Sequence, residues 1–214
     1  MPDQWIAACL SNDLPPGVVI PSVCGGTDIV VWRSASGKVS AWNDRCQHRG
    51  MRLSHGFVRG ETLSCIYHGW VYGEGGACKS IPAHPDLIPP EAIRAVAFSC
   101  VESQNLVWVA PAEVKTLPPE VGDLIPVRSI ALEGNIASVQ QLLSESFTLR
   151  DDGSLRGHAA LAGNELALAL MFQTLTDGRL KLHCLMEKTE DQAQLRDVSR
   201  WLENLRRDVE RTKA

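Results

Sequence analysis

The stretch that decides the fold is Cys46-Gln47-His48-Arg49-Gly50, together with its counterpart Cys65-Ile66-Tyr67-His68-Gly69-Trp70. Each stretch combines one cysteine with one histidine, in a C-x-H pair and a C-x-x-H pair. In a tight loop of this kind both side chains point to the same side, so one loop can offer a sulfur and a nitrogen. A glycine comes shortly after each histidine, where the missing Cβ lets backbone N–H groups approach a bound group. The spacing therefore predicts two loops that hold metal from opposite sides.

The ligand set distinguishes two kinds of metal site. In a Rieske-type [2Fe-2S] cluster, two thiolates bind one iron and two imidazoles bind the other. Structural zinc also accepts two cysteines and two histidines, but its usual pairs are C-x2-4-C and H-x3-5-H, which keep the ligand types apart. Here each loop mixes the types. The pattern favours one [2Fe-2S] cluster over zinc or unrelated core residues, with the ligands Cys46, His48, Cys65 and His68.

Both loops resemble the Rieske domain of ring-hydroxylating and demethylating oxygenases and of their ferredoxins. The likeness extends to Leu53 and Gly56 between the loops. Ile66 stands where the family usually has proline, but it donates nothing to iron, so the ligand set is unaffected. The resemblance also implies which residues surround the cluster: Arg49, Gly50, Tyr67, Gly69 and Trp70.

Respiratory Rieske proteins differ from this pattern at three places. They have cysteines where this chain has Met51 and Tyr67, and a serine in place of Trp70. Without that serine hydroxyl the cluster receives fewer hydrogen bonds, so its reduced, more negative state is less stabilised. We therefore expect a reduction potential near the low end of the Rieske range, about −150 mV. Such a potential suits electrons from a flavin or ferredoxin reductase.

The composition is that of a soluble protein with a packed core. The chain has 214 residues, of which 44% are hydrophobic, and a net charge of −4 that offers no basic stripe for nucleic acid. No apolar run is long enough to cross a membrane, and the N-terminus lacks the segments of a secretion signal. The 7 cysteines do not suggest a disulfide framework. We expect a cytoplasmic protein whose other five cysteines are small buried hydrophobes.

Residues 1–112 are predicted to form the Rieske domain, a small antiparallel β-sandwich with both cluster loops at one tip. Short apolar runs separated by turns predict hairpins over residues 57–64 and 70–79, and closing strands over residues 93–101 and 105–110. We expect a core position for Trp32, Trp42 and Trp108, a surface position for His55 and His84, and a shielding position beside the cluster for Trp70.

The remaining chain is predicted to be a Pro-rich linker, residues 113–126, and a smaller α+β domain, residues 127–214. Hydrophobic periodicity predicts a helix, three strands and a long amphipathic helix, over residues 135–143, 155–161, 165–174, 179–188 and 191–211. This order suggests an antiparallel sheet with the long helix across one face. By resemblance it is a shortened form of the helix-grip domain of the oxygenases.

That oxygenase domain carries mononuclear iron on a D-x2-H-x3-4-H motif and a later carboxylate, a set that leaves positions open for dioxygen. The corresponding segment, residues 133–148, contains no histidine. A triad of His158, His183 and either Glu165 or Glu187 can be imagined, but these histidines lie on separate predicted strands and we expect them to be structural. We expect no mononuclear Fe(II) site, and neither catalytic residues nor the aspartate that joins the two centres in the family can be assigned.

Three functions remain open. The first is an electron-transfer component that takes electrons from a flavin or ferredoxin reductase and passes them to an oxygenase chain, with its C-terminal domain as an assembly surface in an oligomer. The second is a compact Rieske mono- or dioxygenase or demethylase, and the third is a redox-sensing binding protein. The sequence favours the first because it offers a full cluster site and no recognisable oxygen-activating site. Nothing in residues 127–214 identifies a substrate.

Overall fold

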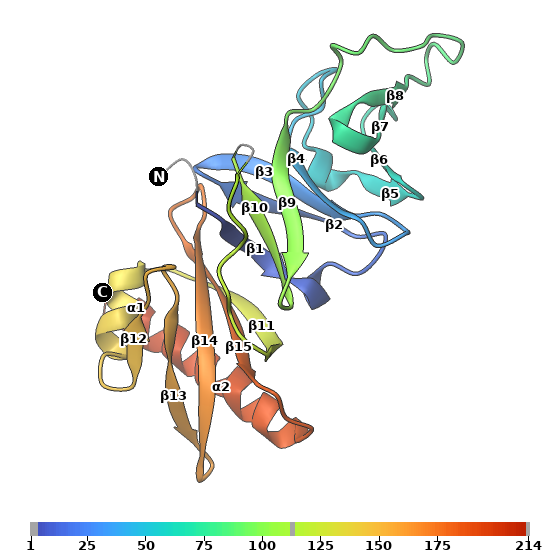
Figure 1. The fold of residues 1–214 in the computed structure, drawn as a ribbon. Helices are drawn as coiled ribbons and strands as arrows, with labels where there is room; N and C mark the ends of the chain where they lie inside the picture. Colours follow the sequence, from blue (N-terminus) through green and yellow to red (C-terminus); the bar gives the residue numbers. More distant parts are fainter. Residues whose placement is uncertain (1–3, 112–113, 213–214) are drawn as a thin grey trace. The chain divides into compact units, whose positions relative to one another are not determined.

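The computed structural model describes residues 4–111 and 114–212 and divides into two compact units (Figure 1). The first unit comprises Met1–Glu102 and Val107–Leu117, and the second comprises Ser103–Leu106 and Pro118–Ala214. Antiparallel strands build both units, and a long helix closes the chain, as predicted for the fold class. Within the described residues, no helix is both long and apolar enough to span a membrane.

The larger sheet of the first unit has six strands in the order β1-β10-β9-β4-β3-β2. These are β1 (Ile6–Leu10), β2 (Val19–Cys24), β3 (Thr27–Arg33), β4 (Val39–Asn43), β9 (Ala97–Ser103) and β10 (Leu106–Ala110). Alternate residues of β3 serve two cores: Val30 and Trp32 belong to one, and Ile29 and Val31 to the other. This is the period of two expected for a strand buried on both faces.

The smaller sheet has the order β5-β6-β7-β8, and the second cluster loop follows its strand β6. Its strands are β5 (Phe57–Arg59), β6 (Thr62–Ser64), β7 (Val71–Tyr72) and β8 (Cys78–Ser80). Both predicted hairpins are confirmed. The three tryptophans expected in the core are at most 3% exposed, and both His55 and His84 are exposed, as predicted.

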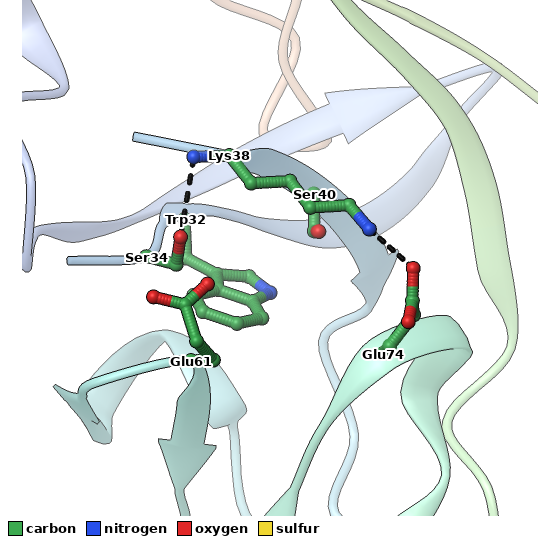
Figure 2. A pocket seen from close by; sticks show the side chains of 6 residues that line it. All are labelled: Trp32, Ser34, Lys38, Ser40, Glu61 and Glu74. Atoms are coloured by element: carbon green, nitrogen blue, oxygen red, sulfur yellow. Dashed lines mark hydrogen bonds and ion pairs between the residues drawn. The ribbon is translucent and has the colours of Figure 1, made fainter. Parts of the chain in front are cut away.

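Polar contacts tie the turn between β3 and β4 to the smaller sheet (Figure 2). Lys38 forms an ion pair with Glu74, and the Ser36 backbone N–H and hydroxyl donate to the Glu61 carboxylate at 3.0 and 2.8 Å. A pocket of about 160 Å³ lies between these ties, and the buried indole Nε1 of Trp32 has no hydrogen-bond partner among the described residues. These exposed contacts link the turn to the smaller sheet and contribute little to stability.

The second unit is a five-stranded sheet in the order β11-β15-β14-β13-β12. Its elements are β11 (Leu124–Leu132), α1 (Ile136–Leu142), β12 (Phe147–Leu149), β13 (Leu155–Leu161), β14 (Asn164–Thr174), β15 (Leu180–Glu187) and α2 (Gln192–Arg211). Side chains of α2 join those of the strands in one core, with Val198, Leu202 and Val209 fully buried. The predicted long helix across one face of an antiparallel sheet is thus present.

The predicted order of one helix, three strands and one helix is wrong because it omits β11 and β12. Strand β11 begins at Leu124, inside the predicted linker, and pairs with β15 along its whole length. Pro126 argued against a strand here, because proline has no N–H to donate to the hydrogen bonds of a sheet. The structure accommodates it at a register shift between Pro126 and Arg128.

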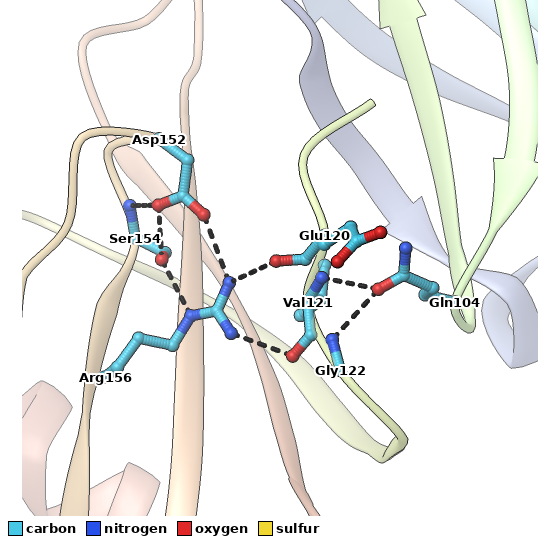
Figure 3. Close-up of polar contacts among 7 residues, drawn as sticks. All are labelled: Gln104, Glu120, Val121, Gly122, Asp152, Ser154 and Arg156. Atoms are coloured by element: carbon cyan, nitrogen blue, oxygen red, sulfur yellow. Dashed lines mark hydrogen bonds and ion pairs between the residues drawn. The ribbon is translucent and has the colours of Figure 1, made fainter. Parts of the chain in front are cut away.

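Side-chain hydrogen bonds fix the segment before β11 within the second unit (Figure 3). The Arg156 guanidinium on β13 donates to the carbonyl oxygens of Val121 and Glu120 at 2.8 and 3.3 Å. The Gln104 side-chain oxygen accepts from the backbone N–H groups of Val121 and Gly122. Part of the predicted linker is therefore a bonded element of this unit.

Candidate metal centre

The first cluster loop follows β4 and closes on itself through two backbone hydrogen bonds. The Cys46 N–H donates to the Met51 carbonyl oxygen at 2.8 Å, and the Gly50 N–H donates to the Cys46 carbonyl oxygen at 2.9 Å. Gly50 has a φ of 70°, in the left-handed region that glycine enters at little cost. The turn therefore favours glycine at this position.

The second cluster loop follows β6 and repeats the same turn. The Cys65 N–H donates to the Trp70 carbonyl oxygen at 2.9 Å, and the Gly69 N–H donates to the Cys65 carbonyl oxygen at 3.0 Å. Gly69 also has a φ of 70°. The two loops are therefore equivalent in backbone, although the histidine is the second residue after the cysteine in one loop and the third in the other.

The four candidate ligands come together as two pairs of different exposure. The imidazoles of His48 and His68 lie side by side, with ring centroids 4.5 Å apart, and both residues are exposed. Cys46 and Cys65 are only 4% and 1% exposed. Burial raises the pKa of the Cys65 thiol, and the neighbouring Cys46 raises it further.

This arrangement fits a [2Fe-2S] cluster. Two neighbouring buried sulfurs match the iron that takes both thiolates, and two neighbouring exposed imidazoles match the iron that takes both histidines. Across residues 4–111 and 114–212, no group of three or more His, Cys, Asp or Glu side chains is placed to hold a metal ion. The donors are grouped by type, in two pairs.

Aromatic rings fix the orientation of both imidazoles. The half-buried Trp70 stacks on His48, with centroids 4.7 Å apart and an interplanar angle of 3°. Tyr67 packs against His68 with a centroid distance of 3.9 Å. The pKa of His48 lies below its ordinary value, first through lost hydration and then through the nearby His68 and Arg49. Trp70 thus lies against His48, and its shielding of a bound cluster stays a prediction.

Tyr72 is a cluster-loop contact that the sequence analysis missed. Its hydroxyl lies 3.1 Å from Cys46 Sγ and accepts a hydrogen bond from the Gln47 N–H at 3.0 Å. Because the Gln47 N–H already donates to this oxygen, the tyrosine proton is free to be donated to the sulfur. A tyrosine in the strand directly after the second loop was the available signal. The reduction potential of about −150 mV expected from the sequence does not include the effect of this hydrogen bond.

Asp44 is a second residue that the sequence analysis missed. Its buried carboxylate accepts from the Ser54 backbone N–H at 2.7 Å and from the Ser54 hydroxyl at 2.6 Å. Arg52 lies 3.4 Å from the same carboxylate and 2.6 Å from Asp28. These bonds tie together the two ends of the segment that contains the first loop.

The histidines of the second unit do not form one site. His158 is exposed and lies opposite Ala167 of β14, whereas the buried His183 lies opposite Met171. Four residues along a strand correspond to about 13 Å. His183 Nδ1 is instead 2.7 Å from the Ser129 hydroxyl, a structural contact of the kind expected.

Comparison with known proteins agrees with this geometry. Residues 4–102 match the Rieske [2Fe-2S] domain family. The chain is 29% identical over 201 residues to oxidoreductase NdmD of Pseudomonas putida, covering 87% of this chain and 34% of that protein. It is 39% identical over 120 residues to pheophorbide a oxygenase of Oryza sativa subsp. japonica, covering 52% and 22%. The chain thus spans about a third or less of the length of these relatives.

Solved structures share the fold over nearly the whole chain. NdmA of Pseudomonas putida CBB5 superposes with a TM-score of 0.73 and 15% identity, covering 98% of this chain and 80% of that one. Apo dicamba monooxygenase gives a TM-score of 0.71 and 18% identity, covering 97% and 84%. At these identities the likeness concerns the fold alone.

Proposed function

Residues 4–102 are a Rieske [2Fe-2S] domain with one cluster, and from this premise we propose that the chain is an electron-transfer component of an oxygenase system. It would receive electrons from a flavin or ferredoxin reductase and pass them to an oxygenase site on another chain. When bound, a Rieske cluster takes up and releases single electrons. Relatives of this chain bear the names oxidoreductase and oxygenase, which supports such a setting.

The observation that carries the proposal is the pair of exposed imidazoles above the pair of buried thiols. We assign Cys46 and Cys65 to the inner iron, and His48 and His68 to the outer iron. Electron transfer between proteins falls off with distance, so an exposed ligand edge is the natural point of exchange. The imidazole edges are that point here, and the sulfurs are protected from solvent.

We further propose that the second domain serves assembly rather than oxygen activation. Its histidines, His158 and His183, are separated along the sheet, and His183 Nδ1 lies against the Ser129 hydroxyl. The proposed domains are residues 1–112 and 127–214, joined by residues 113–126, whose last part from Glu120 is bonded to the second domain. None of the seven cysteines, all of which lie in the described residues, forms a disulfide, and this suits the cytoplasm, a reducing compartment.

Metal and sulfide analysis tests the proposal. Protein purified without oxygen should contain two irons and two sulfides per chain and should show the visible and EPR spectra of a Rieske cluster. A lone zinc without sulfide would overturn it. A third iron together with substrate-dependent NADH consumption would instead establish a compact oxygenase, a candidate that the sequence likeness to pheophorbide a oxygenase supports.

A functional assay separates an electron carrier from a redox sensor. Addition of the cluster-loaded protein to a reductase and an oxygenase chain should increase turnover in proportion to its concentration. An unchanged rate, combined with a redox-dependent change in binding to another protein, would favour the sensor.

A further inference from the structure

The pocket beside the turn that joins β3 to β4 has a buried floor and an exposed rim (Figure 2). Trp32 and Ser34 form the floor and are 3% and 2% exposed, whereas Lys38, Glu61 and Glu74 at the rim are exposed. The volume of about 160 Å³ exceeds what a single water molecule needs. The pocket therefore has room for a small molecule that enters from solvent.

The floor of this pocket offers a hydrogen-bond donor that the protein does not use. Trp32 Nε1 is buried and has no partner among the described residues. The ring is held in place by Trp42, which packs against it edge to face with centroids 5.0 Å apart. In Figure 2 the indole nitrogen points to the side of the pocket where Ser40 and Glu74 lie. Because a buried N–H without an acceptor destabilises a fold, this donor indicates an acceptor on a bound molecule.

The groups beside Trp32 include both donors and acceptors. Ser40 lies directly opposite Trp32 in the pairing of β3 with β4, and its hydroxyl has no partner within the part of the chain that the structure describes. One carboxylate oxygen of Glu74 pairs with Lys38, which leaves the other oxygen as an acceptor. A molecule in the pocket must therefore accept a hydrogen bond from Trp32 and donate one to Glu74.

The charges around the pocket disfavour a small anion as the acceptor. The pKa values of both carboxyl groups lie below the ordinary value, for Glu61 through hydrogen bonds from Ser36 and for Glu74 through its bond to Lys38, so both are ionised at neutral pH. An anion would meet two carboxylates and one ammonium, and a cation would leave the Trp32 N–H without an acceptor. A neutral molecule with hydroxyl groups fits best, because a hydroxyl both accepts and donates.

Independently of the proposed electron transfer, we propose that this pocket binds a small neutral polyol, a molecule with hydroxyl groups on neighbouring carbons. One hydroxyl accepts from Trp32 Nε1, its neighbour donates to the free oxygen of Glu74, and Ser40 bonds to either. Trp32 and Ser40 belong to the larger sheet, whereas Glu61 and Glu74 lie in the turns of the two hairpins of the smaller sheet. The ligand therefore bridges the two sheets of the first unit, and no covalent bond is formed or broken.

NMR of the cluster-loaded, oxidised protein tests the proposal with erythritol as the probe. The Trp32 indole N–H signal, assigned by triple-resonance experiments, should shift with rising erythritol and saturate in the millimolar range, as is usual for so small a ligand. The Trp5 indole N–H, which donates to the Thr116 carbonyl oxygen at 2.9 Å, is the internal control and should not move. The absence of a saturable shift at Trp32 would mean that the pocket holds water only and would overturn the proposal. An equal shift of both signals would mark a solvent effect and would also overturn it.

Two variants test the individual hydrogen bonds. Glu74→Ala should weaken erythritol binding by about fivefold and Ser40→Ala by about threefold, because each removes one contact with the ligand. Glu91→Ala is the matched control, since Glu91 is exposed but does not line the pocket, and its affinity should equal that of the native protein. Native affinity in Glu74→Ala, or an equal loss in Glu91→Ala, would refute the proposed contacts.

Two further compounds test the chemical class of the ligand. Ethylene glycol dimethyl ether keeps the acceptors of a diol but has no donor for Glu74, so it should bind at least about fivefold more weakly than erythritol. Inorganic phosphate should cause no saturable shift at Trp32, because Glu61 and Glu74 repel it. Tighter binding of the ether would show that donation to Glu74 is unimportant, and tighter binding of phosphate would identify an anion site; either result would refute the polyol.

Discussion

The two cluster loops share a backbone turn but differ in what surrounds them. In both, a cysteine N–H bonds to a carbonyl five residues later, and a glycine with a φ of 70° closes the turn. The first loop is held by the buried carboxylate of Asp44 and the hydroxyl of Tyr72. The second exposes Ile66 and Tyr67 to solvent. Both loops therefore need this turn to present a cysteine and a histidine, whereas the residues around each loop differ in what they contact.

Tyr72 contacts the Cys46 sulfur of the first loop, and Asp44 anchors that loop through Ser54. Ile66 and Tyr67 give the second loop an exposed apolar surface. The comparison predicts that loss of either thiol damages the cluster alike, and that variants whose effect depends on the surroundings differ between the two loops.

The largest expected effect comes from removing a thiol. Cys46→Ser and Cys65→Ser should each abolish the cluster, because each is one of the two sulfurs of a single iron. The measurement is the iron and sulfide content with the visible spectrum. Cys24→Ala, a buried cysteine of β2 outside the loops, should retain the cluster. Retention of a native spectrum in either serine variant would break the equivalence of the loops.

Loss of the anchor should affect the first loop strongly. Asp44→Ala removes two charge-assisted hydrogen bonds and leaves the Ser54 N–H and hydroxyl unpaired in a buried position. We expect a loss of about 3 kcal/mol in the free energy of unfolding, measured by urea denaturation. Glu61→Gln, whose exposed carboxylate also accepts from a serine N–H and hydroxyl, should cost clearly less, because solvent replaces exposed hydrogen bonds. Equal costs would show that Asp44 is no special anchor.

The two glycines offer a direct comparison of the loops. Alanine at either position is disfavoured by about 1 kcal/mol, because φ is positive. At Gly69 the added Cβ would also lie 3.1 Å from Pro82 Cγ, whereas at Gly50 the nearest atom belongs to the flexible Arg45 side chain at 3.7 Å. Gly69→Ala should therefore cost about 2 kcal/mol and Gly50→Ala about 1 kcal/mol in thermal or urea unfolding. A reversed order of the two costs would contradict a close approach of Pro82 to the second loop.

The smallest expected effect concerns the reduction potential. Tyr72→Phe removes a donor to Cys46 Sγ, and this donor stabilises the more negative, reduced cluster. The potential should fall by an amount on the order of 50 mV, the equivalent of about 1 kcal/mol for one electron. Tyr67→Phe is the control, because it removes an exposed hydroxyl and keeps the ring against His68. Equal potentials for Tyr72→Phe and the native protein would exclude Tyr72 from tuning the cluster.

Local patterns predicted much of the fold. The hairpin over β5 and β6, strand β13 and helix α2 lie where turn residues and periodicity placed them, because each is specified by nearby residues. Strand β11 was missed, since its pairing with β15 joins segments far apart in the chain and its proline argues locally against a strand.

The sequence by itself determined the Rieske character of the first domain, because four ligands of two types in two short loops, each loop closed by a glycine, specify a chemistry locally. Only the tertiary structure decided that the imidazoles are exposed while the thiols are buried. It also brought the Tyr72 hydroxyl to Cys46 and the Asp44 carboxylate to Ser54. The reason is physical: ligand identity is a property of single residues, whereas burial and hydrogen bonding depend on which distant segments the folded chain packs together.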